Sequence, residues 1–333
     1  MGGKALNKYG VFTERKPTDE FKQIGYELTC RTFFDLGIFS EVVKCYHTKE
    51  SHGDLDLLLK IRPEDAADFR KYINEAFKPN AIHNNGGVFS FDYKNFQVDF
   101  IPIKEDRWKV AGTYYSYDPL GNIMGKTFHK LGMSYGWDGL HYKYRNSHGT
   151  NSANILLTKD PKAIFDMGGY DYERYCKGFD TLEDIFKFVI ESKYFDAEMF
   201  EMENLKSIDK KRNRKRGSYH LFLNYLKDNG IKTKYKFDSK DNYLLDIDVA
   251  FPEVELLYRL HDLYVEDENR KALAEKFNGE LVMSWIPELK GKELGAAMTK
   301  FKELLGEGFD SFIRDSGAEE IKACFIKYYD GRG

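Results

Sequence analysis

Short runs of apolar residues divide the first hundred positions into a helix followed by strands. Phe21, Ile24 and Leu28 recur every three to four residues and predict a helix that begins near Thr18 and ends near Gly37. Compact apolar runs at 42–43, 55–59 and 98–101 are of strand length. A second helical spacing covers 63–77 and includes Ala66 and Ala67. These elements predict a small mixed sheet with helices against it.

A turn signal adds a further strand to this sheet. Asn84-Asn85-Gly86-Gly87 contains the residue types that a tight hairpin turn requires. The segment 88–91 (Val-Phe-Ser-Phe) follows the turn and has a strand-like composition. We therefore expect it to pair with the strand near Val98.

Helical spacing dominates the second half of the chain. It predicts helices over 161–167, 170–175, 181–192 and 218–227. The predicted fold class is α+β, in which a small mixed β-sheet flanked by helices is followed by a mainly α-helical C-terminal domain. The expected division is a catalytic domain at 1–150 and a helical domain, proposed to bind nucleic acid, at 151–333.

Composition narrows the class of protein. The 333 residues carry a formal net charge of -3, which excludes a simple polycationic coat for nucleic acid. No apolar run reaches the roughly 20 residues that span a bilayer, and no signal peptide is evident, so we expect a cytoplasmic protein without a membrane partner. The four cysteines form no zinc-binding spacing. The sequence gives no indication of oligomeric state.

Two aspartates at the start of a predicted strand are the main candidates for chemistry. Asp54 and Asp56 are two residues apart, so a strand projects both to one face while Leu55 and Leu57 enter a core. Adjacent carboxylates repel each other, and a divalent cation such as Mg²⁺ relieves that repulsion. Asp99, in the run 96–101, offers a third carboxylate if its strand lies alongside.

Several blocks together resemble a known family. They are the segment 49–56 (Lys-Glu-Ser-His-Gly-Asp-Leu-Asp), the strand block Val98-Asp99-Phe100, the helix-like segments 115–117, 121–126 and 130–132, and the turn and strand at 135–140. Their order and approximate spacing over residues 40–145 resemble the family X DNA polymerases of the DNA polymerase beta-like nucleotidyltransferase superfamily.

The resemblance implies an enzyme and assigns roles to residues. Asp54, Asp56 and Asp99 would be catalytic and would bind two Mg²⁺ or Mn²⁺ ions. A nucleotide from an NTP or dNTP would be added to the 3′ hydroxyl of DNA or RNA, with release of pyrophosphate. The nucleotide-binding residues would be Lys44, Lys49, Ser51, Gly53, Asn122 and Lys126. The family's Gly-Ser pair is absent from 42–48, and the resemblance then implies that Lys44 or the following Lys49 would supply positive charge instead.

A basic segment is the clearest candidate for contact with nucleic acid. Seven cations fall within the eleven residues 206–216, against one acidic residue, Asp209. The predicted nucleic-acid-binding residues are Lys210, Lys211, Arg212, Arg214, Lys215 and Arg216. The alternative is an ordinary solvated helix face.

Two other functions fit the same residues. One is nucleotidyl transfer to a protein or a small-molecule acceptor, and the other is nucleic-acid binding without catalysis. A second Asp-x-Asp, formed by Asp246 and Asp248, lacks a preceding glycine and an evident partner strand, so we interpret it as structural.

Overall fold

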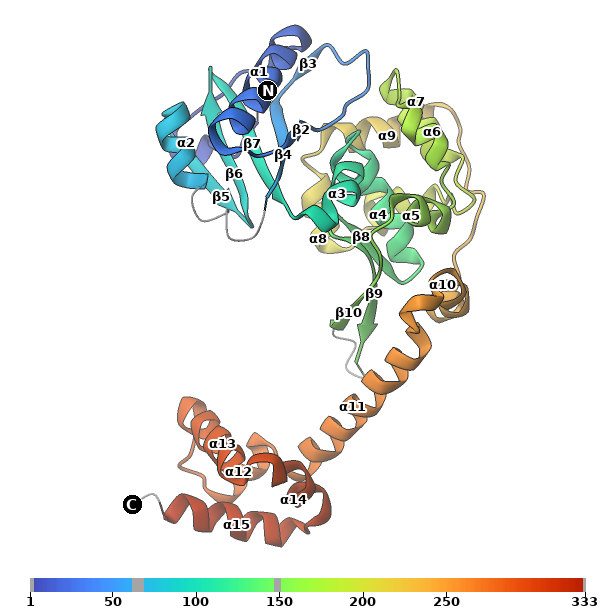
Figure 1. Ribbon diagram of the computed structural model, residues 1–333. Helices are drawn as coiled ribbons and strands as arrows, with labels where there is room; N and C mark the ends of the chain where they lie inside the picture. The colour runs from blue at the N-terminus through green and yellow to red at the C-terminus, as the bar shows by residue number, and fades with distance from the viewer. Residues whose placement is uncertain (1–2, 62–68, 147–150, 332–333) are drawn as a thin grey trace. The chain divides into compact units, whose positions relative to one another are not determined.

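The computed structural model describes residues 3–61, 69–146 and 151–331, which form two compact units (Figure 1). The first unit comprises Met1–Lys143 and Ala153–Val254, and the second comprises Tyr144–Ser152 and Glu255–Gly333. The two units do not coincide with the division at residue 150. That division, with a separate role for each part, stays a prediction.

A mixed sheet of five strands forms the first half of the first unit. Its order is β2 (Ser40–Val42), β4 (Asp54–Lys60), β7 (Phe96–Ile103), β6 (Val88–Tyr93) and β5 (Ile82–Asn85). The central pair β4 and β7 is parallel, while the other pairs are antiparallel. The hairpin predicted at 84–87 joins β5 to β6, with Gly86 and Gly87 at positive φ. The predicted mixed α+β class is confirmed at this level.

Helices α1 (Thr18–Leu36) and α2 (Phe69–Phe77) cover one face of the sheet (Figure 1). The alternating apolar residues of the strands pack there against Leu28 of α1 and Ile73 of α2, all fully buried. Helix α1 ends as predicted, with Gly37 in the left-handed conformation. The first part of the helix predicted at 63–77, including Ala66 and Ala67, lies outside the described residues.

The other face of the sheet is divided between apolar and acidic positions. Its apolar end, with Leu58, Ile101 and Ile103, packs on Ala111 of α3 (Trp108–Tyr115). Helix α4 (Leu120–Lys130) follows α3. A second sheet has the order β10 (Asn151–Thr158), β9 (Gly139–Arg145) and β8 (Met133–Gly136). Strand β10 was not predicted from the sequence.

Helices complete the first unit. They are α5 (Pro161–Gly168), α6 (Tyr172–Lys177), α7 (Leu182–Ile190), α8 (Ser207–Asn213), α9 (Gly217–Asp228) and α10 (Leu244–Ala250). Short 3₁₀ turns and a two-residue strand pair fill the connections: η1 (Asn7–Tyr9), β1 (Lys16–Pro17), β3 (Ser51–His52), η3 (Glu105–Arg107), η4 (Glu198–Phe200), η5 (Met202–Asn204), η6 (Lys240–Tyr243) and η7 (Pro252–Val254). A capping box between Thr181 and Asp184 fixes the start of α7.

The second unit is helical and has its own core. It contains α11 (Leu256–Lys276), α12 (Gly279–Trp285), α13 (Gly291–Leu305), η8 (Gly306–Gly308), α14 (Phe309–Asp315) and α15 (Ala318–Asp330). Aromatic rings of Phe277, Phe301 and Phe325 meet at its centre. Over the described part of the chain, each helix is too short or too polar to cross a bilayer.

Candidate functional site

The register of β4 and β7 brings the three predicted aspartates to one face of the sheet. Asp56 lies opposite Asp99, and Asp54 lies opposite Gln97, in a parallel pair. Side chains alternate along a strand, so Leu55 and Leu57 point to the helix-covered face and are fully buried there. The carboxylates therefore gather on the face that α1 and α2 leave open.

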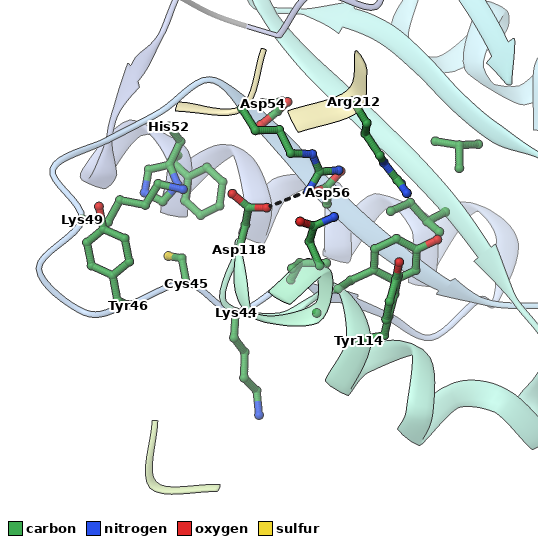
Figure 2. A pocket seen from close by; sticks show the side chains of 18 residues that line it. Lys44, Cys45, Tyr46, Lys49, His52, Asp54, Asp56, Tyr114, Asp118 and Arg212 are labelled. Carbon is green, nitrogen blue, oxygen red and sulfur yellow. Dashed lines mark ion pairs between the residues drawn. The ribbon is translucent and has the colours of Figure 1, made fainter. Parts of the chain in front are cut away.

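A cavity of about 470 Å³ opens beside these carboxylates (Figure 2). Asp54, Asp56 and Asp118 form its acidic side. The remaining lining comes from the loop before β3 and β3 itself, from the sheet strands β6 and β7, from helices α1, α3, α4 and α8, and from the residue before α9. The lining residues beyond the three aspartates are Phe21, Val43, Lys44, Cys45, Tyr46, Lys49, His52, Val88, Ile101, Tyr114, Tyr115, Gly121, Asn122, Arg212 and Arg216.

Burial and mutual repulsion shift the protonation of the acidic face. The pKa of Asp56 is raised well above its ordinary value, first by burial and then by the charges of Asp99, Asp54 and Asp118. The pKa of Asp99 is raised to about 6 because burial outweighs the hydrogen bonds that it accepts from Ser90 and Gln97. The Asp54 side chain is exposed to the cavity, yet the surrounding protein raises its pKa by displacing bulk water. The acidic face is thus short of positive charge.

Hydrogen bonds hold the Asp99 side chain in place on β7. The Gln97 side-chain amide donates to both Asp99 carboxylate oxygens at 3.1 Å. Gln97 Oε1 in turn accepts a hydrogen bond from the Ala5 backbone N–H at 2.9 Å. Asp99 is not among the described residues that line the cavity, whereas Asp118 is. Asp118 was not predicted as a site residue, because it belongs to none of the apolar runs that carry Asp54, Asp56 and Asp99.

Hard carboxylate oxygens with raised pKa values have the donor chemistry that Mg²⁺ and Mn²⁺ select. Within the described residues, however, no three His, Cys, Asp or Glu side chains stand close enough together to form a ready metal-binding group. Asp54 and Asp56, which both line the cavity, stay the predicted residues for an ion there. The predicted set of two ions on three aspartates stays a prediction.

The loop between β2 and β3 carries Lys44 and Lys49 to the cavity. Hydrogen bonds from the backbone N–H groups of His47 and Thr48 to the Phe179 and Asp180 carbonyls, each 2.9 Å long, hold this loop. Lys49 faces the acidic residues and lies near His52, whereas Lys44 points away from the carboxylates (Figure 2). Of the two lysines predicted to supply positive charge at this site, Lys49 is therefore the one oriented toward the carboxylates.

His52 forms a neutral part of the wall. Its ring stacks on Phe21 with 3.7 Å between ring centroids, and its pKa falls to about 4 through burial and the charges of Lys49, Arg15 and Lys22. At neutral pH this imidazole therefore carries no charge. His52 was not predicted as a site residue, and Phe21 was identified only as part of a helical spacing.

Two arginines from the basic segment complete the cavity. Arg212 of α8 and Arg216, just before α9, both line it. Arg216 Nη1 lies 3.5 Å from Asp118 Oδ1, and this ion pair is the dashed line in Figure 2. The Ser218 hydroxyl donates to Asp118 Oδ2 at 2.7 Å. Asp118 thereby connects the turn before α4 to the start of α9.

The structure separates the other predicted nucleotide-binding residues. Asn122 lines the cavity, and its Oδ1 is buried without a hydrogen bond from the described residues. Lys126 lies one turn further along α4, beside the Tyr219 ring at 5.2 Å. Ser51 Oγ accepts a hydrogen bond from Arg15 Nε, and the Gly53 carbonyl accepts one from the Gly3 N–H. Neither Ser51 nor Gly53 is among the described lining residues.

The predicted basic segment is likewise divided. Arg212 and Arg216 face the cavity, while Lys211, Arg214 and Lys215 are exposed on other sides of the segment. Lys210 Nζ donates to the Glu203 carbonyl at 2.8 Å. The local excess of positive charge along the sequence therefore does not define a single surface.

The chain is similar to known proteins at the level of solved structures. No family model and no curated protein matches the chain. Among solved structures, the chain is similar to polymerase beta of Leishmania infantum in a ternary P/T complex, at 14% sequence identity, with a TM-score of 0.37 and coverage of 48% of this chain and 75% of that one. A similarity of this size suggests a polymerase beta-like fold at most.

Proposed function

We propose that the protein is a metal-dependent nucleotidyltransferase with a polymerase beta-like catalytic sheet. It would transfer a nucleotide from an NTP or dNTP to a nucleic-acid 3′ hydroxyl and release pyrophosphate. The observation that carries the proposal is the pairing of opposite charges in one cavity. Asp54 and Asp56 form one side, and Arg212 and Arg216 contribute to another. A cation–polyphosphate complex needs both signs of charge in this arrangement.

The acidic side would hold the metal. Asp54 and Asp56 would bind Mg²⁺ or Mn²⁺, with Asp99 beside them on β7. A bound ion neutralises phosphate charge and favours ionisation of an attacking hydroxyl. The pKa values of Asp54 and Asp56 are raised because burial and neighbouring carboxylates disfavour their ionised forms. A bound cation would stabilise the ionised forms and lower both pKa values.

The basic side would hold the phosphates. Arginine presents a planar fork of donors that matches two phosphate oxygens, so Arg212 and Arg216 are suited to this role. Lys49 adds a point charge from the opposite loop. These residues would replace the Gly-Ser grip that the sequence lacks. The buried Asn122 Oδ1 is an acceptor for an N–H or O–H group of the bound nucleotide.

The first test is transfer of label to an acceptor. The protein is incubated with each labelled NTP and dNTP, with Mg²⁺ or Mn²⁺ and with DNA and RNA oligonucleotides. We expect product from at least one pair, and loss of about 10³-fold or more in Asp54→Asn and Asp56→Asn. The melting temperature of either variant should not fall, because each removes one charge from a repelling cluster.

Asp246→Asn is the matched control. Asp246 belongs to the second Asp-x-Asp, but it lies exposed on helix α10 rather than on a strand. This variant should transfer label at the wild-type rate. Failure of the wild-type protein to label any acceptor, or full activity of Asp54→Asn, would overturn the proposed function.

A further inference from the structure

A second cavity, of about 710 Å³, adjoins the first within the same unit. The two share Tyr114, Gly121, Asn122 and Arg212 as lining residues. The second cavity is strongly basic. Its cations are Lys126, Lys130, Lys143, Lys206, Arg212 and Lys240, and Asp209 is the one carboxylate among its described lining residues.

These cations converge from elements far apart in the sequence. Lys126 and Lys130 belong to α4, Lys143 to β9, and Lys240 to η6. Lys206 directly precedes α8. A solvated helix face places like charges on one element and directs them outward, whereas here several elements direct charge into one hollow. Folding therefore brings together positive charges that repel one another.

The pKa values of two side chains that line the cavity are shifted by this concentration of positive charge. The pKa of His129 is lowered to about 4, first by burial and then by the charges of Lys240, Lys206 and Lys143, which outweigh the opposing charge of Asp209. Burial also lowers the pKa of Lys126, and the charges of Arg212 and Arg216 lower it further. Positive charge therefore exceeds negative charge in this cavity, and a bound polyanion would balance it.

We propose that this second cavity binds the phosphodiester backbone of a single-stranded nucleic acid whose 3′ end reaches the first cavity. The position of the 3′ end rests on the proposed function, in which this strand is the acceptor of the nucleotide. The four shared lining residues make the two cavities direct neighbours, so one strand would have a short distance to extend from the basic cavity to the acidic side. A cavity of this volume has room for a few groups of a single strand but not for a duplex.

The test compares two triple variants with the same change in charge. Lys143→Gln/Lys206→Gln/Lys240→Gln removes three cavity cations, and Lys211→Gln/Arg214→Gln/Lys215→Gln removes three exposed cations of the basic segment. Binding of labelled single-stranded DNA and RNA 12-mers is measured in EDTA, without nucleotide, over a range of salt concentrations. These conditions separate strand binding from catalysis.

The cavity variant should bind at least about 10-fold more weakly. The slope of log affinity against log salt should decrease in magnitude by about 2, since each single-strand phosphate contact contributes about 0.7. The exposed-segment variant should stay within about threefold of wild type. Equal losses in both variants, or a loss confined to the exposed-segment variant, would overturn the proposal.

Competition with inorganic tripolyphosphate separates a strand from a free polyphosphate. The 12-mer should bind more tightly than tripolyphosphate, and the opposite order would show that the cavity is a polyphosphate site. If the triple variant does not fold, the exposed Lys206→Gln substitution should still lower the salt slope by about 0.7. If the proposed transfer reaction is absent, the difference in binding between the two triple variants should remain.

Discussion

His129 shows how neighbouring cations fix the protonation of a single residue. In the unfolded chain this histidine titrates near 6.5, but in the folded protein burial and three lysines hold its pKa near 4. Folding therefore excludes a proton over this interval. The stability that follows is fully present above pH 6.5 and is lost as the pH falls toward 4.

We therefore expect His129→Gln to protect the protein against acid. A pKa lowered from 6.5 to about 4 corresponds to roughly 3 kcal/mol, and partial exposure reduces this to about 2 kcal/mol. Denaturant unfolding of both proteins at pH 7.5, 5 and 4 measures the effect. The variant should gain on the wild type as the pH falls. A difference that stays constant with pH would show that His129 does not exclude a proton.

Single residues also mark what sequence could predict of the site. Asp54 and Asp56 were identifiable because alternation along one strand is local and fixes their common face. Asp118 and Arg216 were not identifiable as a pair, since they meet across about a hundred residues of chain and neither belongs to a local pattern. The roles of all these residues in catalysis stay predictions until activity is measured.

At the scale of elements, the join between α3 and α4 shapes the walls of both cavities. Gly121 near the start of α4 lies against the Tyr114 carbonyl of α3, and a Cβ atom at Gly121 would stand 2.3 Å from that oxygen. Both residues line both cavities. A side chain here has to push the two helices apart.

Gly121→Ala should therefore destabilise the protein by about 2 to 3 kcal/mol. Gly125→Ala, on the same helix, is the control, because no atom lies within 4 Å of its added Cβ. That substitution should raise stability by about 0.5 to 1 kcal/mol, as expected for alanine in place of glycine within a helix. Thermal unfolding of the two variants gives the comparison. Equal effects would mean that the α3–α4 contact is less tight than described.

Elements with a clear period were predictable, and those with mixed signals were not. Helix α1, strands β4 and β7 and the hairpin at 84–87 follow from spacing and turn residues. Strand β10 begins with Asn, Ser and Ala, which give no strand signal, and it forms through pairing with β9. The basic segment reads as one charged surface in sequence, but the turn between α8 and α9 directs its residues to different sides.

At the scale of the whole molecule, the two units have separate aromatic cores. Phe301 is fully buried in the second unit, with ring contacts to Phe277 and Phe325 at 5.5 and 5.1 Å. Phe91 is fully buried in the first unit, where its ring centroid lies 4.9 Å from that of Phe100. Among the described residues, the members of the first cluster lie within residues 21–100 and those of the second within 273–329.

The two cores should therefore unfold in separable steps. Phe301→Ala and Phe91→Ala each leave a cavity and should each cost about 3 to 5 kcal/mol in their own unit. Calorimetry should show two transitions, with each variant lowering only one of them. A single transition that both variants lower equally would show that the units unfold cooperatively as one.

Under the proposed function, the ion pair between Arg216 and Asp118 would link the binding of ions of opposite sign. A phosphate that recruits Arg216 would leave Asp118 with less positive charge beside it, so a cation held by Asp54 and Asp56 would bind more readily. A cation that arrives first would favour release of Arg216 to phosphate by the same argument. Thermodynamic reciprocity makes the two effects equal in free energy. The closed pair would thus neutralise itself in the resting protein and would favour joint binding of the proposed metal and nucleotide over binding of either alone.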